Sequence, residues 1–123
     1  MLETKLPQKK LVEKIVSSID EVKGIDVNLL DLRKIKNTVC GFFVICTGTS
    51  NTHVSAITSS IKKNVSKELK EKPYSMEGLE NQEWVLIDYV DVVVHIFQQN
   101  IREFYDIENL WGDAKISRNK IKV

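Results

Sequence analysis

The sequence predicts one α/β domain with a mixed sheet of about five strands and packed helices. Helix-period and strand-period segments alternate along the chain, and residues 84–97 have the pattern of two adjacent strands. The 123 residues, 42% of them hydrophobic, suffice for one hydrophobic core and not for two comfortable domains. We place the domain at residues 1–114 and expect a basic, flexible tail at residues 115–123.

The first two predicted elements are a helix and a strand. The helix ends at Gly24, and its apolar positions recur at helical spacing: Leu11, Val12, Ile15, Val16, Ile19 and Val22. In residues 25–29 apolar side chains alternate with Asp26 and Asn28, which predicts a strand with one solvated face. The alternation shifts at Leu30, which indicates a bulge or the end of the strand.

A second strand, a turn and a second helix follow. Residues 39–46 are almost all apolar, so we expect this strand to be covered on both faces. After the turn, apolar residues again recur at helical spacing: Val54, Ile57, Ile61, Val65 and Leu69. A glycine turn before a helix can bind an anion. Ser50 and Asn51 are equally ordinary helix caps, and the lysine of a phosphate-binding loop is missing, so we favour capping.

The predicted hairpin at residues 84–97 is the centre of the sheet. Trp84, Leu86 and Asp88 share one face of its first strand, because successive strand side chains point to opposite sides. Both faces of its second strand are apolar, which indicates a central strand or a face that meets a partner. A short strand near residues 74–77 precedes the hairpin. A third helix follows it, with one broad apolar stripe: Ile101, Phe104, Tyr105, Ile107, Leu110 and Trp111.

Charge and cysteine content narrow the classes of function. A net charge of +1 does not favour nucleic-acid binding, and no apolar run approaches the roughly 20 residues that span a bilayer. The first residues lack an apolar signal segment, so we expect a cytoplasmic protein. Cys40 and Cys46 lie roughly 20 Å apart on one predicted strand, so we expect reduced core thiols and no zinc site. Residues 74–101 hold acids and neither lysine nor arginine, which favours a basic protein surface as partner.

Several segments, in this order and spacing, resemble the bacterial ribosomal silencing factor family, also called the Iojap family. The resemblance covers roughly residues 11–114 and rests on six short runs: Gly48-Thr49-Ser50, Glu77-Gly78, Trp84-Val85-Leu86-Ile87-Asp88, Asp91-Val92-Val93-Val94-His95-Ile96-Phe97, Arg102-Glu103-Phe104-Tyr105 and Leu110-Trp111-Gly112-Asp113-Ala114. It implies a nucleotidyltransferase-like fold without established catalysis, and therefore no enzyme and no cofactor. It also implies a translational repressor that binds the large ribosomal subunit through ribosomal protein uL-fourteen and sterically blocks joining with the small subunit. DNA and membranes are not expected partners.

The candidate partner-binding residues are Trp84, Leu86, Asp88, His95, Arg102 and Tyr105. Trp84 leads because tryptophan is enriched among interface hot spots and because it shares a face with Asp88 rather than with Val85. Leu86 extends the same patch. His95 lies in an apolar strand, which favours a satisfied core histidine over a ligand or base. Arg102 and Tyr105 are expected near the rim of the contact, although Tyr105 equally suits the helix stripe.

Two positions depart from the family pattern. Val90 stands where glycine is common in the hairpin connection, so a turn that needs positive φ would be strained there. Thr52 replaces a residue that is commonly basic, which weakens any anion or RNA contact at the turn after Gly48.

Three alternatives remain open beside the repressor hypothesis. The first is a small nucleotidyltransferase-like enzyme that uses Gly48, Ser50, Asp88 and Asp91, although paired aspartates beside a turn are more often turn formers. The second is a ribosome assembly factor, the role that the resemblance implies for organelle relatives. The third is a homodimer that uses the open face of the sheet for itself.

Overall fold

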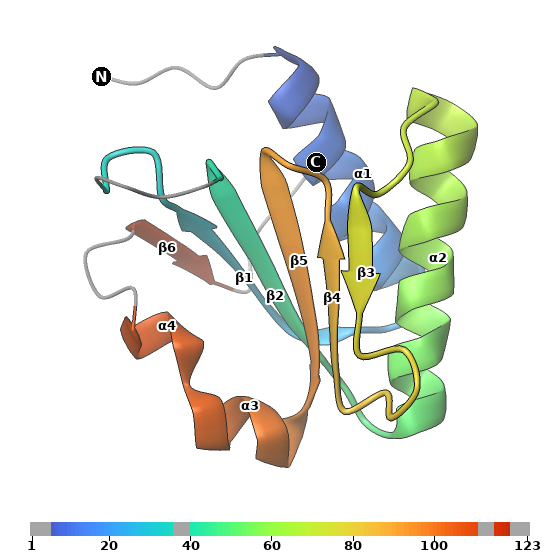
Figure 1. Cartoon of the computed structure of the whole chain (residues 1–123), viewed down its shortest axis with the longest axis vertical. Helices are drawn as coiled ribbons and strands as arrows, with labels where there is room; N and C mark the ends of the chain where they lie inside the picture. The colour runs from blue at the N-terminus through green and yellow to red at the C-terminus, as the bar shows by residue number, and fades with distance from the viewer. Residues whose placement is uncertain (1–5, 36–39, 111–114, 119–123) are drawn as a thin grey trace.

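The computed structural model describes residues 6–35, 40–110 and 115–118, which form a mixed six-stranded sheet with helices on both faces (Figure 1). The elements in chain order are α1 (Leu6–Glu21), β1 (Ile25–Asp31), β2 (Phe42–Gly48), α2 (Asn51–Leu69), β3 (Ser75–Glu77), β4 (Trp84–Asp88), β5 (Val92–Gln98), α3 (Gln99–Tyr105), α4 (Ile107–Leu110) and β6 (Lys115–Arg118). The strand order is β3-β4-β5-β2-β1-β6. Only the β2–β5 pair is parallel among these strands, so the predicted α/β domain with a mixed sheet is confirmed.

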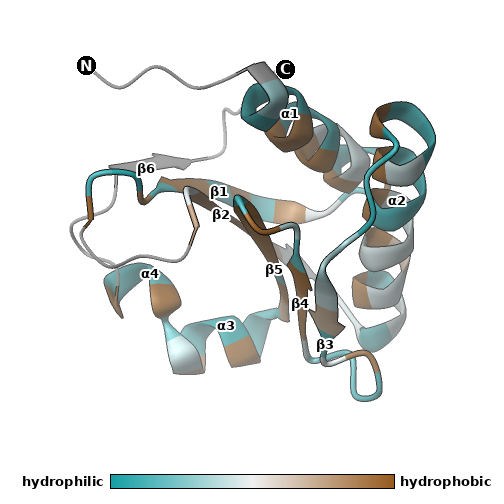
Figure 2. Ribbon diagram, turned by 45° about the horizontal axis from the view of Figure 1, so that its top comes forward, coloured by the Kyte–Doolittle hydropathy of each residue, from teal (hydrophilic) through white to brown (hydrophobic). Residues whose placement is uncertain are grey.

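The larger core lies between the sheet and the pair α1 and α2, as the brown inner faces of these helices show (Figure 2). Its members include helical apolar positions that the sequence predicts, of which Ile15, Ile19, Ile57 and Ile61 are fully buried, together with residues of β2, β4 and β5. Ser50 caps α2, since its hydroxyl oxygen accepts a hydrogen bond from the backbone amide of His53 at 3.1 Å. Within the described residues, no helix has the length and apolarity needed to cross a membrane.

The prediction of one solvated face for β1 is wrong. The pairing register with β2 shifts between Ile25 and Asn28, and Asp26 in the bulge has a positive φ of 51°. Beyond the bulge, Asn28 is buried beside Leu30, with 4% of its surface exposed. The second face is covered because α3 and α4 pack on it (Figure 2). The bulge also lies earlier in the strand than the predicted shift at Leu30.

The tail prediction needs correction for Lys115–Arg118. Their backbone pairs antiparallel with β1, with Leu29 opposite Ser117, and adds a sixth strand at the sheet edge. An unpaired β1 would present a row of free amide and carbonyl groups, and a short strand satisfies them. Residues 119–123 of the predicted tail lie outside the described residues.

The predicted third helix is interrupted. Asp106 adopts a left-handed φ of 46°, and its amide donates to the carbonyl of Arg102, which ends α3 before the short α4 begins. The expected apolar stripe is therefore split: Ile107 is buried, while Phe104 and Leu110 are 79% and 74% exposed. Trp111, which belongs to the same predicted stripe, lies outside the described residues.

Candidate partner-binding surface

An aromatic cluster occupies the face of β4 and β5 that α3 partly covers. We define it by five rings: Phe43, Trp84, His95, Phe97 and Tyr105. Trp84 lies opposite Phe97 across the β4–β5 pair, and their ring centroids are 4.8 Å apart. Tyr105 reaches the same tryptophan from the end of α3, also at 4.8 Å. The structure thus brings together three predicted contact residues, Trp84, His95 and Tyr105, from three successive elements, β4, β5 and α3.

A hydrogen bond orients the centre of this cluster. The indole N–H of Trp84 donates to Nδ1 of His95 at 3.1 Å, so Nδ1 carries no proton and His95 is neutral with its proton on Nε2. Burial lowers the pKa of His95 to about 4, which keeps the ring neutral. Its Nε2 has no hydrogen-bond partner among the described residues. His95 is a core histidine, as its apolar strand predicts, but it is only half satisfied.

Only some of the candidate contact residues are exposed to solvent. Trp84 and Leu86 are half-buried, and Tyr105 is 48% exposed. Phe104 is almost fully exposed next to Tyr105, with the two ring centroids 5.0 Å apart. Phe104 was not a candidate contact, because its helical spacing predicts a packing stripe and nothing local indicates the break at Asp106. We take Trp84, Leu86, Phe104 and Tyr105 as the exposed patch.

Asp88 lies on the same face of β4 as Trp84 but at the opposite end of the strand. Its carboxylate accepts the amide of Val90 at 2.7 Å, and the carbonyl of Tyr89 accepts the amide of Asp91 at 3.0 Å. Val90 has a φ of 75°, so the turn is of the rarer, strained γ type. The predicted strain at Val90 is therefore present, and Asp88 serves as a turn former.

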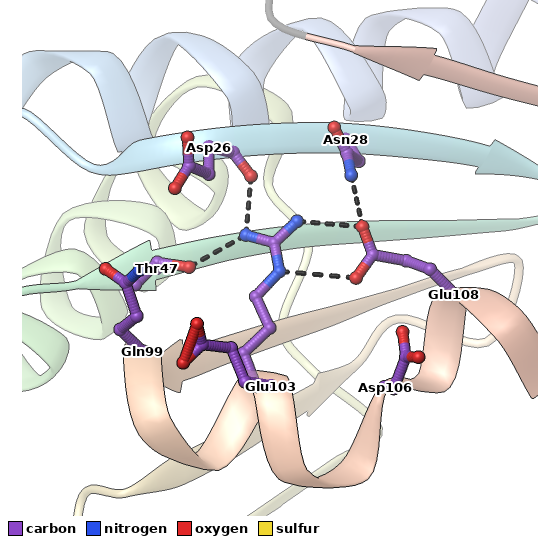
Figure 3. Close-up of a pocket in the computed structure, with 8 residues that line it drawn as sticks. Asp26, Asn28, Thr47, Gln99, Glu103, Asp106 and Glu108 are labelled. Carbon is purple, nitrogen blue, oxygen red and sulfur yellow. Dashed lines mark hydrogen bonds and ion pairs between the residues drawn. The ribbon is translucent and has the colours of Figure 1, made fainter.

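Arg102 does not lie at the rim of the exposed patch. Its guanidinium points into a polar pocket of about 390 Å³ between α3, α4 and the sheet (Figure 3). Nε and Nη2 donate to the two carboxylate oxygens of Glu108 at 3.3 and 2.9 Å, and Nη1 donates to Thr47 Oγ1 and to the Asp26 carbonyl at 2.7 and 2.6 Å. Asn28 donates to the same carboxylate. Arg102 thus connects α3 to α4, β1 and β2, and only 12% of its side chain is exposed.

The residues required by the enzymatic alternative do not converge. Gly48 pairs with Gln98 at one end of β2, whereas Asp91 precedes Val92, the partner of Phe42 at the other end. Six residues of strand separate the two ends, which is roughly 20 Å. Ser50 and His53 also occupy the amides of the Gly48 turn: Thr49 donates to His53 Nδ1 at 2.8 Å, and His53 donates to Ser50. Within the described ranges, no three His, Cys, Asp or Glu side chains form a metal site.

The chain matches a known protein family and several of its members. The family model described as "Ribosomal silencing factor during starvation" matches residues 5–123. A ribosomal silencing factor of Halalkalibacterium halodurans is 38% identical over 109 residues, 89% of this chain and 92% of the relative. A crystal structure of a Chromobacterium violaceum protein superposes with a TM-score of 0.79 at 35% identity, covering 85% of each chain.

An organelle relative is also similar over a shorter stretch. The mouse protein named "Mitochondrial assembly of ribosomal large subunit protein 1" is 36% identical over 73 residues, 57% of this chain and 32% of the relative. The sequence resemblance, the fold and these matches agree. The chain belongs to the ribosomal silencing factor family.

Proposed function

We propose that this protein is a translational repressor that binds the large ribosomal subunit through ribosomal protein uL-fourteen and blocks joining with the small subunit sterically. It acts by occupying a surface, without catalysis. Membership of the ribosomal silencing factor family supports the repressor role. The observation that carries the binding site is the exposed patch of Trp84, Leu86, Phe104 and Tyr105.

The composition of the patch favours a protein partner. Aromatic side chains bring large contact areas and dominate hot spots. A partner that covers the exposed ring of Phe104 removes its apolar surface from water, which favours binding. Trp84 is held in place by Phe97, His95 and Tyr105, so little side-chain freedom is lost when a partner covers it.

The charge around the patch favours a basic partner. Residues 74–101, which include Trp84 and Leu86, contain five acids and neither lysine nor arginine. Asp88 and Asp91 lie at the far end of the β4–β5 pair, so the acids that bear on the patch are Glu77, Glu80 and Glu83. The adjoining Arg102 is neutralised by Glu108. Phosphate backbone would be repelled from this region, whereas a basic ribosomal protein would be attracted to it.

Sedimentation with separated ribosomal subunits tests the proposal. The wild-type protein should migrate with the large subunit and not with the small one, and it should reduce the amount of joined ribosome in a subunit-mixing assay. Phe104→Glu and Leu86→Glu should abolish co-migration, because each places an uncompensated charge in the covered patch.

Leu110→Glu is the matched control for Phe104→Glu. Leu110 is 74% exposed, close to the 79% of Phe104, but it lies on α4, outside the defined patch. Its binding should equal that of the wild type. Failure of the wild-type protein to bind either subunit would contradict the proposed function. Equal loss in the control and the patch variants would contradict the assignment of the patch.

A second candidate function is assembly of the large subunit. It is favoured by the name of the mouse relative, which describes assembly of the mitochondrial ribosomal large subunit. The two roles predict different large subunits in cells that lack the protein. A repressor leaves mature large subunits at normal levels when it is deleted, whereas an assembly factor leaves immature particles that sucrose gradients resolve.

A further inference from the structure

Beside the exposed patch lies a narrow groove between α3 and the loop that connects β3 to β4. It has a volume of about 170 Å³ and is lined by Gly78, Asn81, Glu83, Trp84, Ile101 and Tyr105. Sites for whole small molecules usually measure about 300–1,000 Å³. The groove is therefore of a size for one side chain rather than for a small-molecule ligand.

The loop that forms one wall of the groove is held rigidly. The amide of Gln98 donates to the Glu83 carbonyl at 2.9 Å, and the Gln98 side chain donates to the Gln82 carbonyl at 3.2 Å. Gly78 has a φ of 81°, and a Cβ there would lie 2.0 Å from the carbonyl oxygen of Trp84. Only glycine allows this close approach, so the groove exists before any partner arrives.

The walls of the groove combine aromatic faces with one carboxylate. Trp84 and Tyr105 contribute the rings, and Glu83 is the charged residue among the six that line the groove. Arg102, the base of α3, lines the separate polar pocket and is paired with Glu108. No cation from the lining residues neutralises Glu83, so the groove attracts a positive charge.

We propose that this groove receives an arginine side chain of the protein partner, stacked against Trp84 and Tyr105 and paired with Glu83. The inference rests on the proposed function and names the chemistry of its central contact. Arginine fits better than lysine because its planar guanidinium stacks on an aromatic face while its N–H groups donate to a carboxylate. The groove thereby selects a basic protein surface with a protruding arginine.

The test measures binding of the intact protein to purified large subunits with two matched pairs of variants. Glu83→Gln removes the carboxylate charge and keeps the backbone carbonyl that holds the loop, and Glu80→Gln removes an exposed charge of the same loop outside the groove. Tyr105→Leu removes the ring, and Tyr105→Phe keeps it. Circular dichroism verifies that each variant is folded.

We expect Glu83→Gln and Tyr105→Leu each to weaken binding about tenfold, with Glu80→Gln within about twofold of the wild type. Tyr105→Phe should weaken binding less than Tyr105→Leu, because it keeps the ring. Glu83→Gln should also reduce the dependence of affinity on salt. In a double-mutant cycle with ribosomal protein uL-fourteen, one Arg→Met change in that protein should make Glu83→Gln silent.

The outcomes separate the two proposals. Wild-type protein that binds while Glu83→Gln and Glu80→Gln have equal effects would overturn the groove inference and leave the proposed function standing. A cycle in which a lysine, and no arginine, couples to Glu83 would overturn the choice of arginine. Wild-type protein that fails to bind the large subunit would remove the proposed function and the groove inference with it.

Discussion

The two faces of the sheet are covered in different ways. Under α1 and α2 the core is aliphatic and closed, with Ile15, Ile19, Ile57 and Ile61 fully buried. Under α3 and α4 the cover is short and broken, rings of the aromatic cluster reach solvent, and a buried polar network replaces part of the apolar packing. We therefore infer that the first face supplies most of the stability, whereas the second face leaves the proposed binding patch exposed.

Truncation of the closed core should give the largest effect. Ile15→Ala should lower the free energy of unfolding by about 4 kcal/mol, because a fully buried isoleucine leaves a cavity between α1 and the sheet. Phe104→Ala, on the other face, should change it by less than about 0.5 kcal/mol. Urea unfolding measures both. Similar losses in the two variants would break the division between a stabilising and a binding face.

Loss of Arg102 should destabilise the open face. Arg102→Leu removes the two-pronged ion pair that Arg102 makes with the almost buried Glu108 carboxylate, which should cost about 3 kcal/mol. Tyr105 should then lose its contact with Trp84, seen as a red shift of Trp84 fluorescence in a Trp111→Phe background. The control is the double variant Arg102→Leu with Glu108→Leu, which should recover part of the stability. A destabilised single variant with unchanged fluorescence would show that Arg102 does not position α3.

The neutral His95 predicts a pH dependence of stability. Its pKa lies at about 4 in the folded protein against about 6.5 when exposed, so the unfolded chain binds the extra proton first. The contribution of His95 is present above pH 6.5 and is lost as the pH falls toward 4, in total about 3 kcal/mol. The difference in unfolding free energy between wild type and His95→Gln, measured from pH 7 to pH 4, isolates this contribution from the carboxylates. A difference that is independent of pH would contradict it.

A smaller effect than those of Ile15, Arg102 and His95 is expected at the hairpin turn, away from both faces. Val90→Gly should stabilise the protein by about 1 kcal/mol, because relief of a positive φ in a β-branched residue outweighs the entropy that glycine loses. The urea midpoint should rise with an unchanged slope, and ribosome binding should stay the same. A fall in the midpoint would mean that the turn is not strained by its side chain.

Local patterns determined much of the fold. The helical spacing of apolar residues located α1 and α2, the parity of residues 84–88 put Trp84 with Leu86 and Asp88, and Ser50 capped its helix as predicted. These features depend on neighbours within a few residues, which a single sequence displays. The same holds for the strain at Val90, because a turn of three residues leaves few conformations open.

The candidate site was predicted less completely. Trp84, Leu86 and Tyr105 belong to the exposed patch, whereas Arg102 forms an internal ion pair with Glu108 and Asp88 caps the hairpin turn. Glu83, Gly78 and Ile101, which line the groove, were not candidates. Their role follows from the approach of a loop to a helix, and no local pattern reports it.

The tertiary structure alone decided what covers the second face of the sheet. Arg102 binds Asp26 and Thr47, which are 76 and 55 residues away in the sequence, and Asn28 binds Glu108 across 80 residues. Asp26 and Asn28 alternate with apolar residues, as polar residues do on a strand with one solvated face. The sequence by itself therefore determined the alternation, but the burial of Asn28 depends on the segment that covers it. Whether a polar side chain meets water or a buried partner depends on which distant segment packs over it, and that choice belongs to the folded chain as a whole.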